Sequence, residues 1–451
     1  MSAAEGSLKR EIGVWQGTAL NIIDMVGIGP FVTLPLILAA MGGGRALGAW
    51  ILGALLAICD GLVTAELSAS MPKAGGSYAF LREAYGPLRW GRLISFLFLF
   101  QIIFSAPLSI ASGAIGFARY LKFIAPDIPL RDPVLASILC VLVTLLLFRR
   151  IGAIGKLSIV LWVGVLLTMG IVIIMGLPHI KLEALRFWDA PVFGAPEGLF
   201  GGLGAALLIA VYDYLGYYNI CYIAEEVVEP TKTIPRVIVL SIAVVAILYI
   251  LMNVCVISVL PMEQAMTSKS TVSDYVAVVG GKPLAQVVTV LILWTAFASV
   301  FSLFLGYSRI LFAAARDGNF FKIFARLHPT EGYPVAALVA LGTVAALFSF
   351  LDLKVVVRAI ISIRAIIPFM AQIAGALILR KTQPGLVRPF RMWLYPLPAF
   401  VALLLWGSIL FTDDKKGFSW TGLIVIAAGT IAYLIRSRVA REWPWSAPTA
   451  A

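Results

Sequence analysis

The sequence predicts an all-α integral membrane protein with twelve transmembrane helices. The chain has 451 residues, of which 61% are hydrophobic and only 13% are charged, and its mean hydropathy is +0.97. Soluble domains are about 45–50% apolar and about 25% charged, so the excess of apolar side chains must face lipid. Stretches of about 20 apolar residues, long enough to cross a hydrocarbon core of about 30 Å, recur along the chain.

Twelve such stretches follow one another, and no soluble domain fits between them. They cover residues 14–41, 47–70, 92–120, 134–149, 156–177, 200–225, 235–260, 284–314, 333–351, 355–380, 394–412 and 418–436. We therefore expect a terminal segment at 1–13, one transmembrane domain at 14–436 and a tail at 437–451. The first stretch belongs to the repeating pattern and lacks an A-x-A-like exit, so we do not expect it to be removed as a signal peptide.

Basic residues indicate which side of the membrane each loop faces. If the N-terminus lies inside, most of the 35 Lys and Arg residues fall in segments that face the cytoplasm. We therefore expect both termini in the cytoplasm and a multi-pass protein of the plasma membrane, or of the inner membrane if the protein is bacterial. The net charge of +12 does not indicate nucleic acid, because the basic residues are dispersed over short loops.

Several classes of function find no support in the sequence. The four cysteines lie in apolar stretches without C-x-x-C spacing and the two histidines are isolated, so we expect no metal site. There is no Ser–His or His–Asp constellation typical of an enzyme. The string GAIGKLS at 152–158 has the wrong spacing for the Walker loop of an ATP-driven pump. An ion channel stays open as an alternative, since broken helices also build selectivity filters.

The first stretch is interrupted near its middle by the sequence VGIGP, from Val26 to Pro30. Pro30 has no backbone N–H and disfavours helix in the residue before it, while the two glycines leave the backbone uncovered. An unwound backbone at membrane depth is costly unless it lines a cavity or is buried in protein. We therefore expect two half-helices that meet at Gly27, Ile28 and Gly29, whose N–H groups form a positive dipole end suited to a carboxylate.

A second interruption is expected in the sixth stretch, where Gly216 lies in a dense run of tyrosines. Breaks five spans apart fit a 5+5 inverted repeat, with spans 1–5 and 6–10 as the repeats and spans 11–12 as additions. For each break alone, the alternative is a tolerated kink. Carbonyl groups at Tyr212, Asp213 and Leu215 offer negative ends suited to an ammonium group. Together the two breaks predict a site for a zwitterion with both charged groups on one carbon.

Five stretches, in the right order and over almost the full length, resemble the amino acid–polyamine–organocation (APC) superfamily. They are VGIGPF, AELSASMPKAGGSYAFLREAYGP (65–87), YIAEEVVEPTKTIPR (222–236), SRILFAAARDGNFFKIFARLHPTEGYPV (308–335) and LRKTQPGLVRPFRMWLYP (379–396). The resemblance implies a leucine-transporter-like fold and a secondary active transporter, or permease, that exposes its substrate to each side of the membrane in turn. It implies an amino acid as the substrate. A polyamine-uptake transporter is the alternative, because residues 156–188 are similar to that branch.

The resemblance also assigns residues to the substrate site. They are Gly27, Ile28, Gly29, Tyr212, Asp213, Leu215 and Gly216. Tyr212 would cap the substrate, with a packing tyrosine as the alternative. The family usually has a small or aliphatic residue where this chain has Pro30, and a small or apolar one where it has Asp213.

Asp24 and Asp213 are carboxylates within membrane spans, where such groups are rare and functional by default. Two carboxylates near an ammonium site would favour a substrate with a second positive charge. Alternatively, either one pairs with a basic residue of the bundle, and Arg364 in span 10 is available. Either could carry a coupling proton, because the lysine that serves some relatives in span 5 is not matched. Lys156 lies at the mouth of that span instead.

The remaining candidates concern coupling and gating. Ser299 and Ser302 of span 8 could supply oxygen ligands to Na⁺, although membrane serines more often bond back to their own helix. Coupling to H⁺ is favoured over Na⁺, and no other cofactor is expected. Glu66 and Glu225, at the inner ends of spans 2 and 6, are gating candidates, with solvated interfacial charges as the alternative. The expected partners are an amine-bearing substrate and membrane lipid, without nucleic acid, in a monomer or homodimer.

Overall fold

The fold was taken from a computed structural model, which describes residues 8–41, 44–181, 202–268, 270–410 and 420–445. Parts of both predicted terminal segments, at 1–7 and 446–451, lie outside the described residues. So do the predicted span ends at 200–201, 411–412 and 418–419. Within the described ranges the regular structure is helical, and one isolated bridge between Ile12 and Val227 is the sole β pairing there.

The described helices follow one another along the chain. The α-helices are α1 (Val14–Met25), α2 (Gly29–Met41), α3 (Ala46–Ser70), α4 (Ser77–Ala84), α5 (Trp90–Ile124), α6 (Asp132–Leu146), α7 (Ile151–Gly176), α8 (Leu203–Tyr214), α9 (Asn219–Tyr222), α10 (Pro230–Val259), α11 (Met262–Thr267), α12 (Thr271–Arg316), α13 (Val335–Phe348), α14 (Leu353–Arg364), α15 (Gln372–Thr382), α16 (Leu397–Leu410) and α17 (Trp420–Val439). Short 3₁₀ turns are η1 (Leu177–His179), η3 (Ala224–Glu226) and η4 (Lys322–Ala325), and η5 (Ala365–Ala371) is a π-helix.

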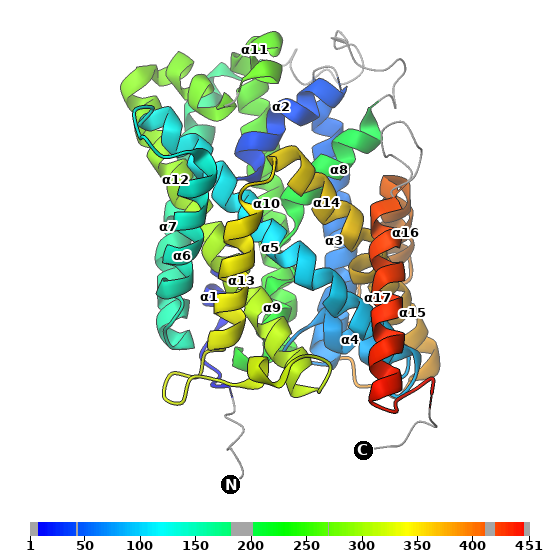
Figure 1. Ribbon diagram of the computed structural model, residues 1–451. Helices are drawn as coiled ribbons and strands as arrows, with labels where there is room; N and C mark the ends of the chain where they lie inside the picture. Colours follow the sequence, from blue (N-terminus) through cyan, green and yellow to red (C-terminus); the bar gives the residue numbers. More distant parts are fainter. Residues whose placement is uncertain (1–7, 42–43, 182–201, 269, 411–419, 446–451) are drawn as a thin grey trace.

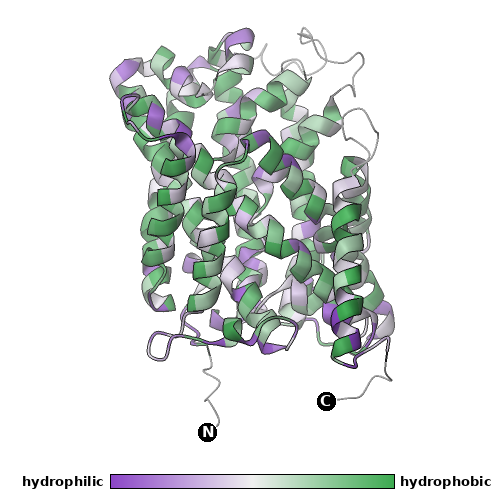
Figure 2. Ribbon diagram, in the orientation of Figure 1, coloured by the Kyte–Doolittle hydropathy of each residue, from purple (hydrophilic) through white to green (hydrophobic). Residues whose placement is uncertain are grey.

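Six of these helices are long and apolar enough to cross a membrane, namely α3, α5, α7 with η1, α10, α12 and α17. A seventh crossing results if α1 and α2, which are bent by 42° at their junction, are taken as one span. Shorter apolar helices are α6, α8, α13 and α16. Hydrophobic residues predominate along the helices, and hydrophilic residues concentrate at the two ends of the bundle (Figure 2). The chain is therefore a multi-pass membrane protein.

Two stretches differ from the sequence prediction in ways that local chemistry explains. The predicted eighth span begins at 284, and the structure continues helix on its N-terminal side, from Thr271, across a kink at Gly281. Gly281 adopts φ 83°, a left-handed conformation that favours glycine, and Pro283 suits the first turn of the helix that follows. The predicted tenth span is α14, η5 and α15 in succession.

The π-helix in this tenth stretch surrounds a proline. Pro368 has no N–H to offer the carbonyl four residues earlier, which belongs to Arg364. A freed carbonyl of this kind is a common cause of a local widening of the helix. Arg364 is thus the last α-helical residue before an irregular turn, and it faces the middle of the bundle.

The two interrupted helices lie in the centre of the bundle (Figure 1). The outer half α2 packs against α8, while α1 packs against α9, so the two interruptions lie at the same level. Around them, α3 packs against α10, and α5 and α7 pack against α12. The structure therefore encloses both interruptions on several sides with continuous helices.

The first and last described residues lie at the same end of the bundle (Figure 1). At this end the amides of Glu11 and Ile12 both donate to the carbonyl of Glu226. The Glu226 side chain forms a bidentate pair with Arg309 of α12 at 3.0 and 3.2 Å, and both side chains are almost fully buried, at 1% and 2% exposure. This buried pair holds the chain after α9 to α12.

Removing one member of this pair should destabilise the protein strongly. Loss of one partner of a buried ion pair costs about 3–5 kcal/mol, whereas replacement of both by apolar residues is often neutral. We expect Arg309→Met to lower the temperature at which the detergent-purified protein loses its size-exclusion peak, and Arg309→Met/Glu226→Leu to recover most of the loss. Arg326→Met, at an exposed arginine, is the matched control. A single variant as stable as the wild type would contradict this account.

Candidate functional site

The interruption predicted in the first span is present between α1 and α2. The last regular bond of α1 runs from the amide of Val26 to the carbonyl of Ile22, and regular bonding resumes when Phe31 donates to Ile28. Among the described residues, no protein acceptor takes a hydrogen bond from the amides of Gly27, Ile28 or Gly29. Three donors at the start of α2 are thus open to a ligand, as expected for a positive helix end.

The interruption predicted in the sixth span lies between α8 and α9. Gly216 adopts φ 123°, and a Cβ atom there would meet the Asp24 carboxyl carbon at 2.9 Å and the Met25 amide at 3.0 Å. Only glycine permits this approach of the two interrupted helices. The backbone of span 6 therefore lies directly against the backbone of span 1.

The carbonyls expected to bind an amine are only partly free. The carbonyl of Tyr212 accepts from the Leu215 amide at 3.2 Å, and that of Asp213 accepts from the Tyr249 hydroxyl at 3.1 Å. In the described part of the chain, the carbonyl of Leu215 has no hydrogen-bond donor. Because a carbonyl has two lone pairs, all three can still accept from a ligand.

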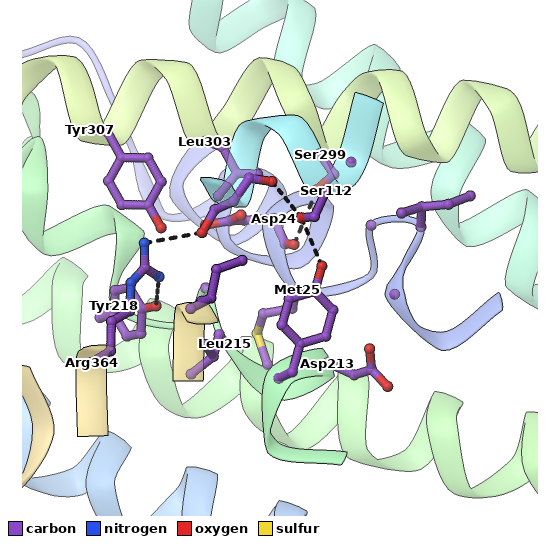
Figure 3. A pocket seen from close by; sticks show the side chains of 18 residues that line it. Asp24, Met25, Ser112, Asp213, Leu215, Tyr218, Ser299, Leu303, Tyr307 and Arg364 are labelled. Carbon is purple, nitrogen blue, oxygen red and sulfur yellow. Dashed lines mark hydrogen bonds between the residues drawn. The ribbon is translucent and has the colours of Figure 1, made fainter. Parts of the chain in front are cut away.

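A cavity of about 40 Å³ is lined by both interruptions. Its lining includes all seven residues predicted to bind substrate, together with Asp24, Ser299 and Arg364. Further lining residues come from α5 and α12, as Figure 3 shows for Ser112, Leu303 and Tyr307. At roughly 10–15 Å³ per water in this measure, the cavity has room for on the order of three waters. A larger solute needs the surrounding helices to move apart.

Arg364 lies at one side of this cavity, 2% exposed, among hydroxyl groups and aromatic rings. Its guanidinium donates to Ser105 at 3.0 Å, to Ser109 at 3.1 Å and to the Tyr218 hydroxyl at 3.3 Å. It also lies 5.1 Å from the centroid of the Tyr307 ring, within cation–π range. These partners satisfy its donors without neutralising its charge.

The two predicted carboxylates occupy different surroundings. Asp213 lies on the opposite side of the cavity from Arg364 (Figure 3). There the Thr33 hydroxyl donates to one oxygen at 2.5 Å, and the second oxygen has no partner. The alternative in which Asp213 pairs with Arg364 is therefore excluded in this conformation, because the bundle places the two side chains apart. Asp24 lines the same cavity as Arg364, although no ion pair within 4.0 Å joins these two described residues.

Tyr212 is both part of the cavity lining and bonded to α5. Its hydroxyl lies 2.9 Å from the Ser112 hydroxyl. Since Ser112 itself donates to the Ser109 carbonyl at 2.7 Å, Tyr212 is the donor of this bond. The ring is thus held at the wall of the cavity by a specific contact.

The two candidate serines of α12, Ser299 and Ser302, do not bond back to their own helix. The Ser302 hydroxyl donates to the Leu20 backbone carbonyl of α1 at 2.8 Å and accepts from the side-chain NH₂ group of Asn219 at 2.8 Å. Ser299 lies 3.5 Å from the Asp24 carbonyl, at the limit of hydrogen bonding. Ser299 lines the cavity, whereas Ser302 joins α1, α9 and α12 beside it.

The gating candidates lie away from the cavity and hold ion pairs. Glu66 accepts from Arg380 at 2.5 and 2.7 Å and lies 3.5 Å from Arg388. Glu225 pairs with Arg316 at 2.6 Å. Both glutamates are therefore ion-paired, Glu66 in buried surroundings and Glu225 at the partly exposed surface of the bundle.

Two further residues join the interruptions, and the sequence analysis did not single them out. The side-chain NH₂ group of Asn21 donates to the backbone carbonyl of Tyr217 at 2.6 Å. The side-chain oxygen of Asn21 accepts from the backbone amide of Ile220 at 3.0 Å. The Tyr249 hydroxyl of α10 lies 2.6 Å from the Met25 carbonyl as well as near that of Asp213. In the sequence, each of these residues is a polar side chain within an apolar span. Such a residue indicates a structural or functional role, but the sequence does not say which group it bonds.

Comparison with known proteins matches a family described as amino acid permease over residues 12–433. The chain is 27% identical over 451 residues to the large neutral amino acids transporter small subunit 2 of Oryctolagus cuniculus, covering 95% of this chain and 81% of the relative. It is 27% identical over 448 residues to the Asc-type amino acid transporter 1 of Mus musculus, with the same coverage. It is also 27% identical over 441 residues to the human cystine/glutamate transporter, covering 95% of this chain and 85% of that protein. The chain belongs to the amino acid permease family of the APC superfamily.

Proposed function

We propose that this protein is a secondary active transporter that moves amino acids across the plasma membrane by alternating access. The observation that carries the proposal is the cavity between two interrupted helices, which open amides face from one side and partly free carbonyls from the other. A solute with a carboxylate and an ammonium group on one carbon would bridge these opposite dipole ends. Its charges would then be stabilised without a buried counter-ion.

The relatives favour an amino acid over a polyamine. Those compared above are named as transporters of amino acids, so the polyamine alternative has no support. The charges at the cavity agree with this preference. Arg364 also lines the cavity, and its positive charge opposes the binding of a dication there. We infer a zwitterionic substrate.

Alternating access requires a complete set of membrane spans, and we propose the architecture of twelve spans that the sequence predicts. Twelve spans would arise from the six long helices, the shorter apolar helices α6, α13 and α16, the two interrupted pairs and the stretch α14–η5–α15, with spans 1–5 and 6–10 as inverted repeats. The end of the bundle that holds the described terminal residues would face the cytoplasm, since the positive-inside rule favours it. We propose proton coupling or exchange as the energy source and a monomer or homodimer as the working form.

A ligand screen tests the substrate class. Ligands that bind only the native state raise its stability, by about 2.7 kcal/mol at a hundredfold excess over Kd. We expect the melting temperature of the detergent-purified protein to rise with one or more α-amino acids and to stay unchanged with putrescine or spermidine. A rise with polyamines alone would overturn the proposed substrate class.

Filling the first interruption should abolish binding. A Cβ atom at Gly29 would already meet the Asp213 carboxyl oxygen and lie 3.5 Å from the Tyr212 ring. We expect Gly29→Leu to lose the ligand-induced thermal shift because its side chain occupies the cavity. Gly407→Leu is the matched control, since nothing lies within 4 Å of a Cβ atom at Gly407.

Both variants should be inserted in the membrane and elute as a single size-exclusion peak. The measurement is the ligand-dependent change in melting temperature of each variant. Substrate binding of wild-type strength in Gly29→Leu would place the substrate elsewhere in the protein.

A further inference from the structure

Asp60 is a third carboxylate in the membrane domain, and the cavity does not account for it. It lies in the middle of α3, its exposure is 0%, and it is not part of the cavity lining. A charged residue type at the centre of an apolar span is costly and marks a functional position by default. The question is which structural element this carboxylate serves.

Asp60 has one hydrogen-bond partner among the described residues. The Tyr217 hydroxyl donates to one carboxyl oxygen, and the other oxygen is buried without a partner. The helices α2, α8, α10, α15 and α16 pack against α3, and none of them brings a described Lys, Arg or His to the carboxyl group. The titratable groups that face it are Tyr217 and the thiol of Cys59 on its own helix.

This environment suits a neutral carboxylic acid better than an anion. An ionised carboxylate has about four lone-pair sites to satisfy, and a single hydroxyl supplies one donor. Burial of an anion without a cation or further donors costs several kcal/mol. In this conformation the packing around Asp60 therefore stabilises the protonated form, and release of the proton requires the surroundings to change.

Tyr217 transmits such a change to the substrate site. It directly follows Gly216 in the interruption, and its carbonyl accepts from Asn21 of α1. Its ring packs edge-on against that of Tyr218 at 5.1 Å, and the Tyr218 hydroxyl accepts from Arg364 at the cavity. A shift of the Tyr217 hydroxyl would therefore displace the segment that separates α8 from α9.

We propose that Asp60 couples proton movement to transport by acting through Tyr217 as a positioning residue. The inference rests on the proposed transport function and names its coupling group. The carboxylate takes one proton from water on one side of the membrane to become the neutral acid, which fits the packing seen here. When the bundle opens to the other side, water reaches the group, the proton leaves and the carboxylate is restored. One proton would thus cross in each cycle.

Asp60 differs from the two carboxylates expected from the sequence to carry a proton. Asp24 and Asp213 both lie in the cavity wall, where the substrate is proposed to bind. Asp60 alone of the three is removed from the substrate and is bonded to the interruption by its side chain. It can therefore be altered without removing a substrate contact.

The test uses the full-length protein in proteoliposomes. The probe is a radiolabelled mixture of the amino acids that occur in proteins. Two quantities are measured, namely counterflow without a gradient and accumulation driven by an inward proton gradient. At one proton per substrate, a gradient of about one pH unit can drive about tenfold accumulation. We expect this accumulation in the wild type. Asp60→Asn should lose it while counterflow persists at the wild-type rate.

Two further variants make the result specific. Asp352→Asn is the matched control, because Asp352 caps α14 at the surface and asparagine caps equally well. It should keep both activities. Tyr217→Phe removes the hydroxyl that contacts Asp60 and should shift the pH at which gradient-driven uptake is half-maximal. This readout would not move if Asp60 served only to stabilise the fold.

The outcomes separate this inference from the proposed function. Absence of counterflow in the wild type would overturn the transport proposal itself. Counterflow without any response to the proton gradient in the wild type would overturn the role of Asp60 alone. So would an Asp60→Asn variant that keeps gradient-driven accumulation. If Asp60→Asn does not fold, an unchanged pH profile in Tyr217→Phe would overturn it as well.

Discussion

The requirement that backbone polar groups at membrane depth find partners governs the arrangement of this protein. Each interrupted helix leaves several such groups without their regular helical bonds. Part of the need is met by side chains of neighbouring helices, since Asn21 bonds the backbone of span 6 and Tyr249 bonds the ends of both α1 and α8. The amides of Gly27 to Gly29 remain unmatched within the described residues, which makes them the natural position for a ligand.

The polar groups around the cavity are arranged by the same constraint. Arg364 carries a full charge into the bundle, and hydroxyl groups from α5 and from the sixth-span interruption satisfy its donors. These hydroxyls come from helices that contact the interruptions. A movement of either interruption therefore changes the surroundings of the guanidinium, so the site and the moving elements are physically joined. The same holds for Asp60, which reaches the interruption from α3 through a tyrosine.

Ion pairs between distant segments gather at the end of the bundle that holds both described termini. The buried pair of Glu226 and Arg309 and the pairs made by Glu66 and Glu225 join segments that are far apart in the sequence. Opening of the cavity toward this end in a transport cycle would require some of these pairs to separate.

The sequence by itself determined the helical membrane class and the positions of both interruptions. Those features depend on local chemistry, namely apolar stretches of sufficient length, Pro30 without an N–H and Gly216 without a Cβ atom. It also marked Asp24, Asp213 and Arg364 as unusual. Only the tertiary structure decided that Asp213 turns to Thr33 and that Ser302 bonds to α1. It also joined Asp60 to Tyr217, because contacts between residues more than a hundred positions apart depend on how whole helices pack.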